Sequence, residues 1–313
     1  MEKKSKILIT GSEGMVGKNL INKLESLGYI NLILPSKKDL DLREREKVFG
    51  YFSKVKPKYV FHLAARVGGI KANMENPVEF LRDNLLLNTN ILDASYSYKV
   101  KKLINLGSSC IYPKECSQPM REESLLSGKF EPTNEGYAIS KVSSLKLCEF
   151  YNKEYGTNFI SLMPPNMYGR FEKFDGKTSH VLASLLKKFR ESKVDKKGFV
   201  SVWGDGTAKR EFLYAKDMAE ILIFSMNKIN SGDLYESGFL NCGSSEEISI
   251  GNLARLIKKV VGFEGEILFD DSKPIGMKRK MLDSSRFLSF GFNKFTSLKE
   301  GIKETYTWYK ENK

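Results

Sequence analysis

The chain has 313 residues, 41% of them hydrophobic, with a mean hydropathy of −0.35. It is long enough to bury a substantial core, and no apolar run reaches the ~18–20 residues that would span a membrane. The formal net charge is +13, but the lysines lie in scattered pairs such as Lys101-Lys102 and Lys258-Lys259. Nucleic-acid binders concentrate such charge in one arm or patch, so we expect no nucleic-acid partner and no membrane association.

The amino-terminal run Met1-Glu-Lys-Lys lacks the apolar core of a signal peptide, and no cysteine has a metal-like C-x-x-C spacing. We therefore expect reduced thiols, a cytoplasmic location and no metal site. The cysteines are Cys110, Cys116, Cys148 and Cys242.

The first element is a short aliphatic run over Lys6–Thr10, which reads as a buried parallel strand. Three glycines with G-x-x-G-x-x-G spacing follow, and then an amphipathic helix over Asn19–Leu27 that Gly28 would end. Glycines between a strand and a helix permit a tight turn and let backbone N–H groups approach a pyrophosphate. We expect dinucleotide contacts from this loop, at Gly11, Glu13, Gly14, Met15, Val16 and Gly17.

The second strand, over Asn31–Leu34, leads into Pro35-Ser36-Lys37-Lys38 and has no carboxylate at its tip. An acidic residue there would bind the ribose 2′-hydroxyl of NAD, whereas cations suit the 2′-phosphate of NADP. Lys37 and Lys38 favour NADP(H), although two ordinary surface lysines would look the same. Glu13 opposes this preference, because a carboxylate in the glycine loop would repel a nearby 2′-phosphate.

Strand-like and helix-like segments alternate from residue 6 to residue 163, which predicts an α/β fold with a Rossmann-type, doubly wound parallel sheet. Beyond Pro164-Pro165 the alternation decays. We expect residues 1–166 to form the dinucleotide domain, joined by a returning segment near 200–230, and residues 167–313 to form mainly a substrate-binding lobe. The further segments of the alternation are strands at 59–63, 103–106 and 159–163 and helices near 76–99 and 137–155.

Small or polar residues follow three of these strands, where ligands of such sheets collect. Ala64-Ala65 would let a cofactor lie against the backbone, and a serine after the strand at 103–106 could hydrogen-bond a substrate carbonyl. Tyr137 and Lys141 share one helix face, and a lysine beside a phenol favours the phenolate, so Tyr137 could exchange protons near neutral pH. These residues predict hydride transfer between a nicotinamide and a carbonyl or alcohol. The alternative is that the serines are turn residues and Tyr137 is core packing.

The chain resembles the GDP-L-fucose synthase family of extended short-chain dehydrogenases/reductases. Matching runs occur in order over nearly the whole chain. They are Gly11–Gly17, Ala64–Ile70, Gly107–Pro113, Glu131–Glu135, Tyr137–Lys141, Asn166–Gly169, Ser179–Val181, Trp203–Thr207, Arg210–Leu213 and Arg279–Asp283.

This resemblance implies NADPH-dependent reduction at C4 of a GDP-4-keto-6-deoxy sugar after epimerisation at C3 and C5, giving GDP-fucose. It implies that Ser108, Tyr137 and Lys141 carry out the reduction, with Cys110 as epimerisation base and His180 as acid. A positive environment would suit a Cys110 thiolate, and His180 titrates near neutrality. His180 alone would be read as a helix-start or surface residue, and His62 as a core residue.

The resemblance further implies a homodimer and two sets of binding residues. The cofactor contacts beyond the glycine loop are Lys37, Ala64, Ala65, Tyr137, Lys141, Pro164 and Asn166. The substrate contacts are Ser108, Ser109, Asn166, Lys188, Trp203, Arg210 and Arg279.

Several positions near the expected sugar pocket depart from the family pattern, among them Pro165, Arg170-Phe171 and the segment before His180. These departures leave the identity of the sugar undetermined by the sequence. A C4 reductase for a related GDP-4-keto-6-deoxy sugar such as a heptose, with little epimerase activity, is the closest alternative. A nucleotide-sugar 4-epimerase or dehydratase is a more distant one, and a dinucleotide-sensing scaffold the only non-enzyme candidate.

Overall fold

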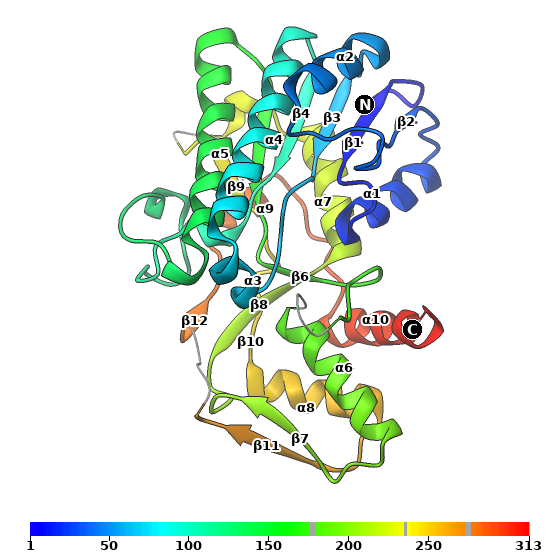
Figure 1. Ribbon diagram of the computed structural model, residues 1–313, viewed down its shortest axis with the longest axis vertical. Helices are drawn as coiled ribbons and strands as arrows, with labels where there is room; N and C mark the ends of the chain where they lie inside the picture. The colour runs from blue at the N-terminus through cyan, green and yellow to red at the C-terminus, as the bar shows by residue number, and fades with distance from the viewer. Residues whose placement is uncertain (176–179, 235–236, 273–276, 313) are drawn as a thin grey trace.

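The computed structural model describes residues 1–175, 180–234, 237–272 and 277–312. Its upper part in Figure 1 is a six-stranded parallel sheet in the order β2-β1-β3-β4-β5-β9. The predicted Rossmann-type sheet is thereby confirmed. The strands are β1 Ile7–Thr10, β2 Leu32–Ile33, β3 Tyr59–His62, β4 Lys102–Leu106, β5 Phe159–Met163 and β9 Phe239–Asn241.

Helices cover both faces of this sheet. Successive residues of a strand point to opposite faces, so Ile7 and Ile9 belong to one hydrophobic cluster and Leu8 to another. The first cluster includes residues of α1 Met15–Ser26, α7 Ala215–Lys228 and α9 Ser285–Ser289. The second includes residues of α2 Arg45–Val55, α4 Pro77–Ser97 and α5 Glu135–Tyr155. Burial on both faces explains why these strands read as continuous apolar runs.

The chain returns to the sheet after leaving it. α7 packs against the sheet with Met218, Ile221 and Leu222 buried, and β9 adds the sixth strand beside β5. The returning segment therefore begins at Ala215, whereas β7 Phe199–Trp203 lies in the second unit.

The second unit fills the lower part of Figure 1. β8 Lys209–Tyr214 pairs with β6 Asn166–Tyr168, β10 Glu247–Ser249 and β12 Arg279–Lys280, and β7 pairs with β11 Glu266–Asp270. α6 Val181–Val194, α8 Ile250–Val261 and α10 Leu298–Asn312 pack on these strands around a separate hydrophobic core. In α8 the buried residues Leu253, Ala254, Ile257 and Val261 recur with helical spacing, which fixes the face that it presents to that core.

Short helical elements lie in several of the loops. α3 Ile70–Glu75 follows the loop after β3, and four single turns of 3₁₀ helix occur elsewhere among the described residues. They are η1 Ser109–Ile111, η2 Glu122–Ser124, η3 Pro132–Asn134 and η4 Ser231–Asp233. None of the helices in the described part of the chain has the length and apolar character needed to cross a membrane.

Two boundaries differ from the expected ones. α1 begins at Met15 rather than Asn19, so the last glycine of the loop lies inside the helix. Leu27 is 38% exposed and does not continue the buried stripe of Leu20 and Leu24, because the helix ends at Ser26.

Candidate active site

The glycine loop is shaped by contacts that leave no room for side chains. Gly11 has φ +72°, and a Cβ there would lie 2.8 Å from the backbone nitrogen of Ala64. A Cβ on Gly17 would lie 2.2 Å from the carbonyl oxygen of Gly11. Each glycine is thus required by a close approach of backbone segments.

The start of α1 suits an anion. Its N-cap residue is Gly14, no side chain caps the helix, and its first turn holds no acidic residue. Unpaired N–H groups and the helix dipole therefore face the loop, as a pyrophosphate requires. Val16 is buried, and Met15 is half-buried. The residues present fit a dinucleotide.

The tip of β2 offers positive charge. Lys37 and Lys38 are exposed, and the carboxylate of the next residue, Asp39, accepts hydrogen bonds from the backbone and hydroxyl of Ser36. Glu13 is also exposed. On the neighbouring strand, Ala64 and Ala65 are half-buried after β3.

Ser108, Tyr137 and Lys141 meet where β4 ends and α5 begins. The Ser108 hydroxyl lies within hydrogen-bonding reach of the Tyr137 phenol. Lys141 is 3% exposed, and its Nζ lies 5.9 Å from the centroid of the Tyr137 ring. The same Nζ donates a hydrogen bond to the carbonyl oxygen of Leu106 at 2.7 Å, which anchors α5 to the end of β4.

Burial dominates the titration of this pair. It raises the pKa of Tyr137, with a smaller contribution from Cys110, and the hydrogen bond from Ser108 lowers it only in part. Burial also lowers the pKa of Lys141 to about 8. Desolvation thus outweighs the effect of the nearby ammonium on the phenol. A raised pKa keeps the phenol protonated near neutral pH, which suits Tyr137 to the donor half of the donor-or-acceptor role expected for it.

Cys110 lies in η1, directly beyond Ser108. Its backbone N–H donates to the Ser108 hydroxyl oxygen at 3.3 Å. Its Sγ accepts from Nδ2 of Asn134 at 3.3 Å and from Nζ of Lys280 at 3.7 Å. Ser109 is buried, and its N–H donates to the carbonyl of Pro164 at 3.2 Å, so β4 and β5 hold the turn together.

His180 is the N-cap residue of α6. The residue keeps an exposed surface, but neighbouring atoms desolvate its ring, and this burial together with the charge of Lys280 lowers the pKa of His180. Ser179, the preceding residue of the matching run, lies outside the described residues. His62, by contrast, is buried and bonded to Thr10 and Asn88, as a core residue would be.

The expected substrate residues lie on the second unit. Lys188 in α6 donates to the carbonyl of Ser201 at 3.1 Å, and its Nζ lies 5.6 Å from the centroid of the Trp203 ring, which is 61% exposed. Asn166 begins β6 and donates to the carbonyl of Glu211. Arg210 lies in β8, where burial lowers its pKa.

Nε of Arg279 pairs with the Glu247 carboxylate at 2.6 Å. The neighbouring Lys280 faces Cys110 instead. Two residues at Cys110 were thus missed from the sequence: Lys280 and Asn134. Both lie inside matching runs, and strand alternation next to Arg279 was the signal that could have indicated Lys280.

A family model described as "NAD dependent epimerase/dehydratase family" matches residues 7–243. The chain is 44% identical to the GDP-L-fucose synthase of Sinorhizobium fredii, over 98% of this chain and 96% of that one. It is 41% identical to the GDP-L-fucose synthase of Escherichia coli, over 99% and 98%.

Among solved structures, MlghC, a GDP-mannoheptose C4 reductase from Campylobacter jejuni with NADP bound, superposes with a TM-score of 0.92. It is 35% identical and is covered over 99% of both chains. The fold and the Ser-Tyr-Lys site thus define an enzyme of the epimerase/dehydratase class. Within that class, the chain belongs to the GDP-L-fucose synthase family.

Proposed function

We propose that the protein reduces C4 of a GDP-4-keto-6-deoxy sugar with NADPH, after epimerising C3 and C5, and so forms GDP-fucose. The observation that carries this proposal is that Ser108, Tyr137 and Lys141 adjoin Cys110, so that reducing and epimerising groups share one site. The identity of about two fifths to the GDP-L-fucose synthases over nearly the full chain supports the same activity.

NADPH, held by the glycine loop and Lys37, would supply the hydride for the reductive step. Ser108 donates a hydrogen bond to the C4 oxygen, and Tyr137 gives that oxygen its proton. Because burial keeps the Tyr137 phenol protonated, the proton is present when the negative charge develops on O4. Lys141 contributes positive charge beside the ring and ties α5 to β4.

In the epimerising step, the 4-keto group acidifies the hydrogens at C3 and C5. Cys110 removes one of them as the base, and His180 returns a proton to the opposite face of the ring. The thiol and the imidazole come from different units of the fold, so a sugar held between them would present one face to each.

We further propose how the two parts of the chain divide the binding. Residues 1–166, with α7 and β9, would hold NADP(H) through the glycine loop, Lys37, Ala64, Ala65, Pro164 and Asn166. Residues 167–313 would bind the GDP-sugar, with Arg210 and Lys188 near the diphosphate and Trp203 against a flat apolar group. The free cysteines suit the cytoplasm, where we expect the protein to act.

A second candidate is a C4 reductase for a GDP-linked heptose that has lost epimerisation. It is favoured by the likeness to the heptose C4 reductase and by Pro165 and Arg170 near the expected pocket. Incubation with GDP-4-keto-6-deoxymannose in D₂O without NADPH separates the two. Deuterium at C3 and C5 is expected; absence of exchange with brisk NADPH oxidation on a heptose substrate would favour the second candidate.

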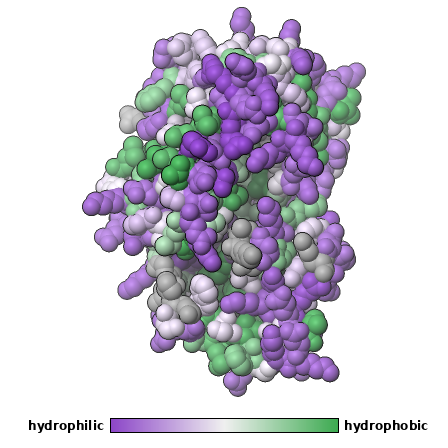
Figure 2. Space-filling model, in the orientation of Figure 1, coloured by the Kyte–Doolittle hydropathy of each residue, from purple (hydrophilic) through white to green (hydrophobic). Residues whose placement is uncertain are grey.

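We propose that the protein is a homodimer formed through α4 and α5. Figure 2 shows a hydrophobic area where Figure 1 draws these two helices, on a surface that is otherwise mostly hydrophilic. Its exposed side chains include Leu86 at 41% and Phe150 at 54%. Apolar surface of this kind on adjacent helices is typical of a docking face.

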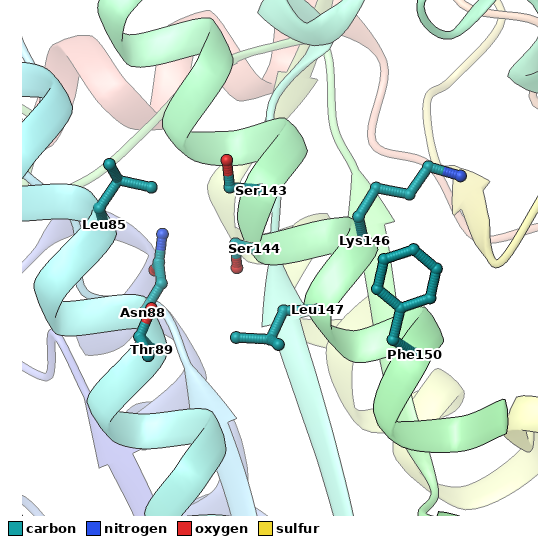
Figure 3. Close-up of a pocket in the computed structure, with 8 residues that line it drawn as sticks. All are labelled: Leu85, Asn88, Thr89, Ser143, Ser144, Lys146, Leu147 and Phe150. Carbon is teal, nitrogen blue, oxygen red and sulfur yellow. The ribbon is translucent and has the colours of Figure 1, made fainter. Parts of the chain in front are cut away.

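A groove of about 340 Å³ runs between the same two helices. Figure 3 shows Leu147 of α5 pointing across it toward Asn88 and Thr89 of α4, whereas the Phe150 ring lies farther from α4, beside Lys146. The groove lies outside the Ser108–Tyr137–Lys141 set and would receive side chains of a second copy. Two such helix pairs would pack as a four-helix arrangement with twofold symmetry.

A further inference from the structure

The segment Arg279–Asp283 is fixed on both sides. On one side β12 pairs with β8, with Lys280 opposite Arg210. On the other side Met120 donates to the carbonyl of Met281 and accepts from the N–H of Asp283, each at 2.8 Å. The backbone of Lys280 is therefore held between β8 and the segment at Met120, which fixes the position of its Cα.

The Lys280 side chain ends at Cys110. Neighbouring residues of a strand point in opposite directions, so Arg279 pairs with Glu247 while Lys280 reaches Sγ of Cys110 at 3.7 Å. Among the residues that the structure describes, no carboxylate forms an ion pair with Lys280. Its positive charge is thus directed at the sulfur.

Asn134 approaches the same sulfur from another element. It is the N-cap residue of α5, yet its side chain makes no capping hydrogen bond. Its Nδ2 donates to Cys110 at 3.3 Å, and its buried Oδ1 has no hydrogen-bond partner in the described chain. An N-cap asparagine normally accepts from the first turn of its helix, which stabilises the helix by roughly 1 kcal/mol. Asn134 forgoes that bond and turns toward the sulfur.

We propose that Lys280 and Asn134 are positioning residues that stabilise the thiolate form of Cys110, and this proposal rests on the epimerisation in the proposed function. The thiolate takes the proton from C3 or C5, the C–H electron pair passes into the enolate, and an S–H bond forms. His180 then supplies a proton to the opposite face as a new C–H bond forms. The thiol proton finally leaves through solvent, and His180 takes one up.

Other charged and titratable groups face this sulfur. Tyr137 and Lys141 approach from α5, and His180, at the start of α6, lies near the ammonium of Lys280. Burial and the charge of Lys280 lower the pKa of His180, which makes its imidazolium a stronger acid toward the enolate carbon. The same ammonium also reduces the fraction of His180 that is protonated near neutral pH, so it favours the thiolate more than it favours the acid.

The test measures the thiol directly and needs no substrate. The rate of iodoacetamide alkylation at Cys110 is followed against pH by peptide mass spectrometry, with Cys116 in the same samples as an internal reference. The variants are Lys280→Met, Lys280→Arg and Asn134→Ala. The matched control is Lys278→Met, which removes an exposed lysine two residues away.

We expect the pH midpoint of Cys110 alkylation to rise by about one unit in Lys280→Met, which slows alkylation near pH 7 about tenfold. Asn134→Ala should move it in the same direction, Lys280→Arg should restore it, and Lys278→Met should leave it unchanged. An unchanged midpoint in Lys280→Met, or an equal shift at Cys116, would overturn the proposal.

Deuterium exchange at C3 and C5 tells this proposal apart from the function on which it rests. If Lys280→Met shifts the alkylation midpoint but the wild type shows no deuterium exchange, the role of Lys280 at the thiolate stands and the proposed epimerase activity is wrong. If the wild type exchanges deuterium but the pH midpoint of Cys110 alkylation is the same in Lys280→Met, the epimerase activity stands and the proposed role of Lys280 is wrong.

Discussion

Ser108, Tyr137, Lys141 and Cys110 lie together where β4 ends and α5 begins, and the proposed function gives them two different reactions. Tyr137 is half-buried with a desolvated phenol whose pKa is raised, whereas the sulfur of Cys110 accepts from an amide and an ammonium. We therefore expect the two groups to carry out different proton transfers, which single substitutions can separate.

Tyr137→Phe keeps the ring and its packing against Phe80 but removes the acid. Because general acid catalysis typically contributes ~10²–10⁴-fold, we expect NADPH oxidation to fall by that order. Exchange at C3 and C5 in D₂O should persist, since enolate formation needs only a hydrogen bond at O4. Loss of exchange together with reduction would argue against a separate role for Tyr137.

Cys110→Ser should have the reverse effect, since a hydroxyl is a much weaker base than a thiolate. Exchange should stop, while a substrate that has already been epimerised is still reduced at a rate near that of the wild type. Both activities are read in the same assays. If reduction of the epimerised substrate falls as far as in Tyr137→Phe, the assignment of Cys110 to epimerisation is wrong.

Sequence reasoning worked where spacing within one element decides which residues meet, as for Tyr137 and Lys141. It failed where residues meet through the fold. Lys280 reaches Cys110 across 170 positions of sequence, and Asn134 across 24. No periodicity links such positions, and the burial that raises the pKa of Tyr137 depends on the whole fold.

At the scale of elements, the β1–loop–α1 unit fits a dinucleotide only while its glycines are kept. The parallel, doubly wound sheet was predictable from alternation, whereas its sixth strand was not. β9 is a run of three residues, too short for a pattern, and follows a long excursion into the second unit.

Gly17→Ala tests the loop. The added Cβ would meet the carbonyl of Gly11 and the backbone of Ser12, so we expect loss of NADPH binding in a fluorescence titration and a lower melting temperature. The matched control is Gly50→Ala in α2, where no atom lies within 4 Å and helix propensity favours alanine by ~0.5–1 kcal/mol. Undiminished NADPH binding in Gly17→Ala would contradict the close-packed loop.

His62 links β1 to β3 and predicts a pH dependence of stability. Burial lowers the pKa of His62 to about 3, below its ordinary value of ~6.5, so the unfolded chain binds more protons between these values. The contribution of neutral His62 to the free energy of unfolding is complete above pH ~6.5. It is lost as the pH falls toward 3, by up to ~1.4 kcal/mol per pH unit. Urea unfolding should therefore show a steeper loss between pH 6 and 4 in the wild type than in His62→Gln. Equal pH dependence of the free energy of unfolding in the wild type and His62→Gln would contradict this role of His62.

At the scale of the whole molecule, the apolar face of α4 and α5 predicts assembly. Phe150→Glu places a charge on this face and should convert a dimer to a monomer in sedimentation velocity. Val194→Glu is the control, because Val194 is 72% exposed at the end of α6, away from this face. A dimer that survives Phe150→Glu, or a wild type that is monomeric, would contradict the proposed interface.

The central claim is net reduction of a GDP-4-keto-6-deoxy sugar at C4. The most direct measurement supplies GDP-4-keto-6-deoxymannose and NADPH deuterated at the transferred position, and then locates the label by NMR. We predict one NADPH oxidised per product, with deuterium at C4 of GDP-fucose. A tightly retained cofactor with no net oxidation of added NADPH, and no label at C4, would contradict the account.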